Sequence, residues 1–456
     1  MCRRRRIQRT RPARPSHGRW PRAASVSLLA AALATALATA LLLPGPTGSL
    51  PRAAAAVRAR GAGVPCTERA PRAPRLHARA TTLGVPAPPF GVAIAPGGRF
   101  AFAGLGGSVG VFSLATGRLH LRSTIAVPGQ ARGLALSPNG RYLVVADGAG
   151  GAAVLDVASA ERGSGSALLG QLTSTGHGAI EASVSPDGAF VFVTLEYGNE
   201  LVVFNLRRAI ATGFASSQPV GVVPLENPVG MATSPDGRYL YVTSEVGTSP
   251  GQGTLTVVDI ATAETNASRA VVASVPAGCD PVRVVAARGS VYVAARGSDS
   301  VLWFSSRALV HAPSHALKAR VRVGPEPVGL AVVDGGAALL VADSDRYGTS
   351  AHASLALVRL HAGGRPTLAG YLVSGRFPRD IATARRGHLA IVADYRSSRL
   401  ETLSLRSLPA ARSYGSVRTS TAVTVLPKPE TRPATEHQDP LPGIVYLISA
   451  VHRSPA

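Results

Sequence analysis

The stretch Pro228-Val-Gly-Met-Ala-Thr-Ser-Pro-Asp-Gly237 decides the fold, because variants of it recur along the body of the chain. Aligned on Gly230 of this stretch, the seven copies have their equivalent residue at Gly91, Gly133, Glu181, Gly230, Arg283, Gly329 and Asp380. Their successive spacings are 42, 48, 49, 53, 46 and 51 residues. A fixed period of this length indicates a repeat architecture, in which each unit stacks on its neighbours.

Each unit contains four short strand signals. In the fourth unit an alternating segment meets the Ser-Pro-Asp-Gly turn, and a β-branched and aromatic strand follows at 239–243. A third strand is expected at 255–259 and a fourth at 270–276. Four antiparallel strands repeated seven times predict an all-β, seven-bladed β-propeller. No capped helical period intervenes between the strands, so βαβ architectures are excluded.

These residues resemble the YVTN-repeat family of seven-bladed propellers. The family's inner-strand pattern matches 228–237, and its namesake strand appears as Tyr241-Val-Thr-Ser244. The resemblance covers roughly residues 81–410 and is strongest in the first four units. Relatives include extracytoplasmic binding and surface proteins and lactonase-like propellers related to 6-phosphogluconolactonase, so the resemblance implies one of these activities.

Four segments are expected along the chain. Residues 1–56 form a signal peptide or membrane anchor, 57–80 a linker, 81–410 the propeller, and 411–456 C-terminal strands and a flexible tail. Ring closure needs a strand from one terminus. The front segment 78–85 is slightly favoured over 417–426, while 444–451 is a further apolar strand. The Pro-rich stretch 427–443 reads as a mobile linker.

The N-terminal segment predicts export. Nine arginines between Arg3 and Arg22 precede an apolar run of 21 residues, Ala23–Leu43. Positive charge before an apolar run keeps the N-terminus in the cytoplasm. The run is long for a cleaved signal and long enough to span a bilayer, so a signal peptide and an anchor remain alternatives. Both place the body outside the cytoplasm, secreted or at the cell surface.

Composition narrows the class of protein. The chain has 46% hydrophobic and 16% charged residues and a net charge of +23. Its arginines are scattered and few aromatic residues are interleaved with them, so a nucleic-acid partner is not expected. Cys66 and Cys279 are a candidate disulfide, because an exported protein can form one, and buried thiols are the alternative.

Three charged residues replace glycine at the start of an inner strand. Glu181, Arg283 and Asp380 stand where the other units have glycine, and this position faces the propeller axis. They are the candidate ligand-binding residues. Glu181 and Asp380, with His177 four residues before Glu181, are also candidate catalytic acids and bases. A network of mutually paired ions explains the same residues without any function.

A second set of acids is predicted to occupy equivalent positions at the end of the second strand in five units. The candidate metal ligands are Asp147, Glu196, Glu245, Asp343 and Asp394. Carboxylate oxygens gathered on one rim suit Ca²⁺. Charges that merely cap strand ends account for them equally well, and no other cofactor is expected.

The favoured function is therefore an exported binding or scaffold module. It would hold a small polar ligand or a protein partner at its loop face, and it would meet a membrane only through an uncleaved N-terminal segment. The alternative is a lactonase-like hydrolase that opens a cyclic ester with carboxylates at the mouth of the channel. A non-catalytic role is preferred, because no catalytic motif supports the hydrolase.

Overall fold

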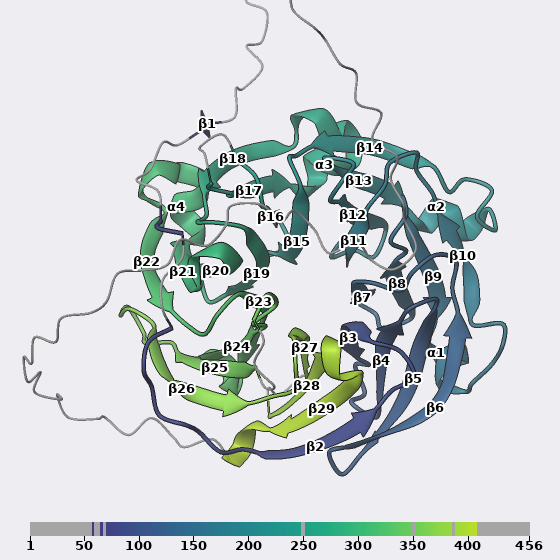
Figure 1. The fold of residues 1–456 in the computed structure, drawn as a ribbon. Helices are drawn as coiled ribbons and strands as arrows, with labels where there is room; N and C mark the ends of the chain where they lie inside the picture. Colours follow the sequence, from purple (N-terminus) through teal and green to yellow (C-terminus); the bar gives the residue numbers. More distant parts are fainter. Residues whose placement is uncertain are drawn as a thin grey trace, which may run out of the picture. The chain divides into compact units, whose positions relative to one another are not determined.

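The computed structural model describes residues 57–58, 64–66, 70–247, 251–348, 353–384 and 388–407. Seven sheets, each with four antiparallel strands, stand around a common axis, and one of them carries a short fifth strand (Figure 1). Their inner strands contact one another in cyclic order, and the seventh contacts the first. The predicted seven-bladed propeller is confirmed. The expected anchor within 1–56 and the segments 417–426, 427–443 and 444–451 lie outside the described residues.

The strands of the first four blades follow in chain order. Blade 1 comprises β3 (Pro89–Ile94), β4 (Phe100–Leu105), β5 (Ser108–Ala115) and β6 (Arg118–Ala126). Blade 2 comprises β7 (Leu134–Leu136), β8 (Tyr142–Ala146), β9 (Ala152–Asp156) and β10 (Leu168–Leu172). Blade 3 comprises β11 (Ala179–Val184), β12 (Phe190–Leu195), β13 (Glu200–Asn205) and β14 (Pro219–Pro224). Blade 4 comprises β15 (Pro228–Thr233), β16 (Tyr239–Ser244), β17 (Thr254–Asp259) and β18 (Val271–Pro276).

The last three blades complete the ring. Blade 5 comprises β19 (Pro281–Ala287), β20 (Ser290–Ala295), β21 (Ser300–Ser305) and β22 (Leu317–Arg322). Blade 6 comprises β23 (Pro327–Val333), β24 (Ala338–Asp343), β25 (Ser354–Arg359) and β26 (Thr367–Val373). Blade 7 comprises β27 (Pro378–Thr383), β28 (Leu389–Asp394), β29 (Arg399–Ser404) and β2 (Arg79–Gly84).

The outer strand of blade 7 comes from the front of the chain. β2 pairs antiparallel with β29, from Arg79 opposite Ser404 to Gly84 opposite Arg399. Figure 1 shows this strand, in purple, at the outer edge of the yellow β29. The sheet of blade 7 thus contains both ends of the propeller, as the front-strand alternative predicts. Closure in this way gives the last blade the fourth, outer strand that the other six blades have.

The Ser-Pro-Asp-Gly turns explain why the first two strands of a blade form a hairpin. In blade 4, Ser234 donates a hydrogen bond to Asp236 Oδ1 (2.5 Å) and accepts one from the Tyr239 amide (2.9 Å). Gly237 follows at φ 73°, in the left-handed region that glycine favours. Blade 5 lacks this turn. Arg288 (φ 50°) and Gly289 (φ 72°) instead form a two-residue turn between Ala287 and Ser290.

Apolar residues fill the space between neighbouring blades. Phe102 and Leu143 are fully buried between blades 1 and 2, and Phe304 lies in the cluster between blades 4 and 5. Similar clusters occupy the other interfaces, including the one between blades 7 and 1, where Ile391 and Phe112 meet. Since each blade is buried on both faces, its central strands read as nearly continuous apolar runs.

Short helices join the third and fourth strands of blades 2 to 5, a feature that the sequence analysis did not predict. They are α1 (Val157–Glu161), α2 (Leu206–Ala211), α3 (Ile260–Asn266) and α4 (Ser306–His311). Each is capped by the last residue of the preceding strand, namely Asp156, Asn205, Asp259 or Ser305. A single turn or two of helix is too short to give a recognisable hydrophobic period.

Short 3₁₀ segments occur at several turns. They are η1 (Ala267–Arg269), η2 (Arg296–Ser298), η3 (Pro313–His315), η4 (Asp334–Gly336), η5 (Tyr395–Ser397) and η6 (Leu405–Ser407). No helix among the described residues is both long and apolar enough to cross a membrane.

The segment expected as a linker is attached to the propeller at several points. β1 (Val57–Arg58) pairs parallel with β18 on the outside of blade 4. Cys66 and Cys279 form a disulfide with their Cα atoms 5.5 Å apart. Further along, the Leu76 amide donates to the Tyr371 carbonyl (2.7 Å) at the edge of blade 6. The chain therefore runs along the outside of blades 4 to 6 before it enters blade 7 as β2.

Candidate functional site

Glu181, Arg283 and Asp380 meet at the propeller axis. They come from the inner strands of blades 3, 5 and 7, and Arg283 Nη1 pairs with Glu181 Oε2. Arg283 Nη2 lies 3.4 Å from Asp380 Oδ1, and the three side chains are only 13–17% exposed. Asp380 Oδ2 also accepts a hydrogen bond from the Val92 amide of blade 1 (3.0 Å). One guanidinium therefore compensates two carboxylates, and the three ions connect blades across the hub.

The glycines between these charges allow the inner strands to approach closely. A Cβ on Gly230 would lie 2.4 Å from the Val282 carbonyl oxygen, and a Cβ on Gly91 would lie 2.5 Å from that of Arg132. At Gly133 the added atom would also meet Glu181 Oε1 at 2.6 Å. The charged side chains thus occupy room that the glycines of neighbouring blades leave.

The five acids that follow the second strands do not form one ring. Strand registers place Asp343 and Asp394 opposite the prolines that begin β23 and β27, and Asp147 occupies the corresponding position of blade 2. Glu196 and Glu245 lie one residue further along, beyond the last paired residue of β12 and β16. The expectation of five equivalent positions is therefore wrong, because alignment by sequence alone missed a one-residue offset.

The offset separates two kinds of environment. The carboxylates of Asp147, Asp343 and Asp394 are buried inside their blades. Asp147 accepts hydrogen bonds from the Ala149 and Gly151 amides (2.8 and 3.0 Å). Asp343 accepts from the Ser354 hydroxyl (2.9 Å). Nowhere in the described part of the chain do three or more His, Cys, Asp or Glu residues gather in a way that could hold a metal ion. Ca²⁺ binding by this set stays an untested prediction.

Asp394 belongs to a buried cluster beside the closing strand. Ser374 Oγ lies 3.0 Å from Asp394 Oδ1 and 2.9 Å from Glu401 Oε2, while Arg399 Nε lies 2.8 Å from Asp394 Oδ2. A hydroxyl carries one proton, so it can donate to only one of the two carboxyl groups. Burial and the charge of Asp394 raise the pKa of Glu401 to about 7. At a pH below about 7 a protonated Glu401 therefore supplies the proton for the second contact.

We expect Glu401→Gln to flatten the dependence of stability on pH. The folded-state pKa lies above the unfolded one, so the folded wild type loses stability as pH rises from about 4.5 to 7. At pH 8 the variant should be more stable than wild type by about 2–3 kcal/mol, and at pH 4 the two should be similar. Urea unfolding at both pH values measures this. Exposed Glu226→Gln is the control, and identical profiles for wild type and Glu401→Gln would contradict the shared proton.

A cavity of about 320 Å³ lies at the propeller axis, and Glu181 and Arg283 are part of its lining. Its walls carry three glutamates, Glu181, Glu196 and Glu245, against twice as many arginines. The arginines are Arg132, Arg283, Arg296, Arg346, Arg379 and Arg396. Arg283 is compensated by Glu181 and Asp380, and Arg296 Nη1 pairs with Glu245 Oε1 at 2.9 Å. With six arginines against three glutamates, the cavity lining has an excess of positive charge.

Two of these arginines share one aromatic ring. The guanidinium carbon of Arg379 lies 3.6 Å from the centroid of Phe90, and that of Arg132 lies 5.4 Å from it. The three residues occupy the same position of β27, of β3 and of the segment before β7, in three consecutive blades. Neither arginine forms an ion pair with any described residue, and the buried Nε atom of each lacks a hydrogen-bond partner there. Arg132 is only 7% exposed.

The surroundings of Arg379 are aromatic and positively charged. Phe377 and Tyr395 stand 5.6 and 5.8 Å from its guanidinium carbon, and their rings pack against each other edge-on. Loss of hydration and the charges of neighbouring arginines lower the pKa of Arg379 to about 9. It remains protonated at neutral pH. Stacking uses the faces of a guanidinium and leaves the N–H groups in its plane available to an acceptor.

Phe377 is held in a backbone conformation that is unusual for a bulky residue. Its φ is 51°, in the left-handed region, immediately before the proline that begins β27. Asn227, Asp280 and Glu326 adopt the same conformation before the corresponding prolines. The repeat geometry therefore imposes the backbone, and at this blade it turns a phenyl ring toward the cavity.

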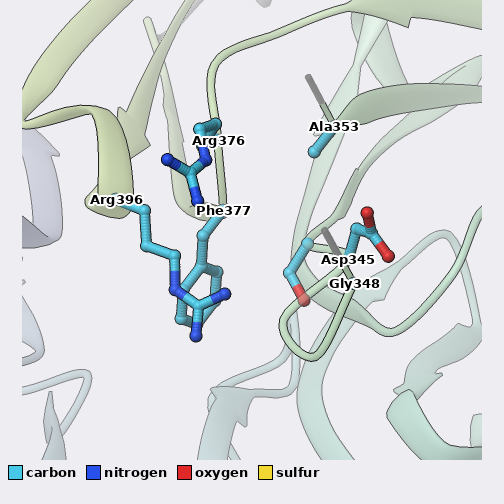
Figure 2. Close-up of a pocket in the computed structure, with 7 residues that line it drawn as sticks. Asp345, Gly348, Ala353, Arg376, Phe377 and Arg396 are labelled. Atoms are coloured by element: carbon cyan, nitrogen blue, oxygen red, sulfur yellow. The ribbon is translucent and has the colours of Figure 1, made fainter. Parts of the chain in front are cut away.

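A small neighbouring cavity shares residues with the axial one. Figure 2 shows Phe377 and Arg396 on one side of it, with Asp345 and Gly348 on the other. Its volume of about 10 Å³ accommodates no more than a single water molecule. His177 lines neither cavity and is exposed, so the structure does not bring it to the other candidate residues.

Comparison with known proteins identifies the architecture. No family model and no curated protein matches the chain. Among solved structures, a chain of hydrazine synthase from Kuenenia stuttgartiensis is similar, with a TM-score of 0.55 and 17% sequence identity. The match covers 71% of this chain and 97% of that one. A likeness at this identity shows the propeller fold alone. Membership of the YVTN-repeat family stays a prediction.

The arginine pair was not predicted from the sequence. The predicted site lies at the repeat position that holds glycine in most units, whereas Phe90, Arg132 and Arg379 occupy the position before it. In the other four units that position holds Ile180, Val229, Val282 or Val328. Two arginines at a repeat position that is otherwise apolar were therefore a signal in the sequence, which an alignment of the seven units at this position reveals.

Proposed function

We propose that this chain is an exported propeller that binds a small anionic ligand in its axial cavity. The observation that carries the proposal is the pair Arg132 and Arg379, which flank Phe90 at the cavity wall without a compensating acid. A charge withdrawn from water and left unpaired costs several kcal/mol. An anion bound between the two guanidiniums would offset that cost through charge-assisted hydrogen bonds.

The size and lining of the cavity fit a small molecule. About 320 Å³ lies at the lower end of the range for small-molecule sites. Its apolar residues form a ring from successive inner strands, to which Ile180, Val229 and Val282 belong. A ligand with an apolar body and an anionic group would contact both kinds of surface.

Export is supported by the sequence and by one covalent feature. The arginine-rich start and the apolar run Ala23–Leu43 are those of a secreted or membrane-anchored protein. The disulfide between Cys66 and Cys279 suits an oxidising compartment. Location outside the cytoplasm is thus part of the proposal, together with the YVTN-repeat relationship.

No observation favours the hydrolase alternative. Glu181 and Asp380, its candidate acid and base, both pair with Arg283 at the hub. Both carboxylates are therefore engaged within the protein, where they compensate one guanidinium. We therefore retain binding as the single proposed function.

Titration calorimetry with straight-chain carboxylates, from acetate to hexanoate, tests the proposal. We expect hexanoate to bind, because its chain can reach the apolar ring, and Arg379→Met or Arg132→Met to weaken binding about 10- to 100-fold. Arg238→Met is the matched control, since Arg238 also stacks on an aromatic ring, Tyr239, but on the surface. Undetectable hexanoate binding, or equal loss in the control, would contradict the proposal.

A further inference from the structure

The charges of the axial cavity are unevenly distributed around the ring. Blades 6, 7 and 2 contribute Arg346, Arg379 and Arg132, whereas blades 3 and 4 contribute Glu196 and Glu245. Blade 5 adds Arg296, whose charge is directed to Glu245 at 2.9 Å and to Asp280 at 3.8 Å. The cavity therefore has a positive arc and a shorter negative arc.

Glu196 is the uncompensated acid of the negative arc. Among the described residues its carboxylate forms no ion pair and no hydrogen bond, while that of its neighbour Glu245 is paired with Arg296. Loss of hydration and repulsion by Glu245 raise the pKa of Glu196 to about 7. The positive charges of Arg379 and Arg132 act on Glu196 only through space. They lower its pKa in part, but the pKa stays above the ordinary value of a glutamate. A cationic group placed beside it would be stabilised by both glutamates.

The apolar ring lies among these charges. Val229, Val282 and Val328 line the cavity together with the arginines and glutamates, and Phe377 packs in the same cluster. A ligand that spans the two arcs must cross this surface. A purely ionic ligand would gain nothing from it, whereas a short hydrocarbon chain would.

We propose that the ligand of the axial cavity is a small zwitterion, with its carboxylate between Arg132 and Arg379 and its ammonium group at Glu196. This inference rests on the proposed anion-binding function and adds the cationic pole and the apolar spacer. The chemical class is therefore that of amino carboxylates. The two arcs fit such a dipole in one orientation only. The carboxylate must face the arginines of the positive arc, and the ammonium group must face the glutamates of the negative arc.

The test uses the purified protein and a series of ω-amino carboxylates from glycine to 6-aminohexanoate. Each is titrated beside the carboxylate of equal chain length that lacks the amino group. We expect the best zwitterion to bind about 10-fold more tightly than its matched carboxylate. Glu196→Gln should remove this advantage, so that in the variant each zwitterion and its matched carboxylate bind with the same affinity to within about twofold. The exposed Glu226→Gln is the control for general effects of losing a negative charge.

The outcomes separate the two proposals. If carboxylates bind and no zwitterion of the series exceeds its matched carboxylate, the cationic pole at Glu196 is wrong and the anion site stands. If the zwitterion advantage survives Glu196→Gln, the ammonium group lies elsewhere and the assignment is overturned. If neither series binds, the anion site itself is contradicted. Thermal unfolding of each variant without ligand verifies that the fold is intact.

Discussion

Replacement of Arg283 by methionine is expected to destabilise the propeller by about 3–5 kcal/mol. The substitution removes the one cation that compensates Glu181 and Asp380, whose side chains are only 13% and 17% exposed. Two carboxylates would then remain at the hub without a compensating cation. Methionine nearly preserves the volume of the side chain, so the loss reports charge rather than packing. Urea unfolding at pH 7 measures it.

A triple variant sharpens this prediction. Glu181→Gln and Asp380→Asn, combined with Arg283→Met, should recover most of the lost stability, because no uncompensated charge remains. Arg207→Met is the control: its ion pair with Asp187 is at the surface, with Arg207 73% exposed, and should change stability by less than about 0.5 kcal/mol. A loss for Arg283→Met no larger than that of the control would show that the hub charges are not coupled.

Removal of the closing strand is expected to have the second large effect. A chain that starts at residue 86 lacks β2, so β29 becomes an open edge and six paired positions lose their partners. Leu83 also leaves the interface between blades 7 and 1. Lost hydrogen bonds and apolar contacts together should lower the free energy of unfolding by on the order of 5 kcal/mol. The open edge should also promote self-association, visible by size-exclusion chromatography.

A chain that starts at residue 77 provides the matched control for this truncation. It keeps β2 and lacks the same upstream residues, including Cys66, so both truncated chains have lost the disulfide. Any difference in melting temperature between them belongs to residues 77–85. Equal melting temperatures and equal elution would mean that another segment closes the ring in solution.

Much of the fold was predictable because the repeat encodes it locally. Ser-Pro-Asp-Gly turns fix the first hairpin of blades 3 and 4, and variants of the turn do so in blades 1 and 2. The sevenfold recurrence of the inner-strand pattern determines the number of blades. Closure by the front segment followed from the position of Thr81 and its neighbours directly before the first unit, and the structure pairs that segment with β29. The convergence of Glu181, Arg283 and Asp380 followed from one shared repeat position.

The candidate site was less predictable, because it depends on register and on contacts between blades. A one-residue offset separates Glu196 from Asp394, and only the strand pairing reveals it. Arg132 and Arg379 are far apart in the chain, and they share Phe90 only because ring closure places blade 7 beside blade 1. The repeat period of the sequence does not indicate such a contact between blades.

A crystal structure of the protein with bound hexanoate tests the central claim most directly. We predict electron density for the carboxylate within hydrogen-bonding distance of both Arg132 and Arg379, with the hydrocarbon chain against Phe90 and the valine ring. Hexanoate found only at other arginines, or the two guanidiniums engaged with acids of the protein while the cavity remains without ligand, would contradict an anion-binding propeller.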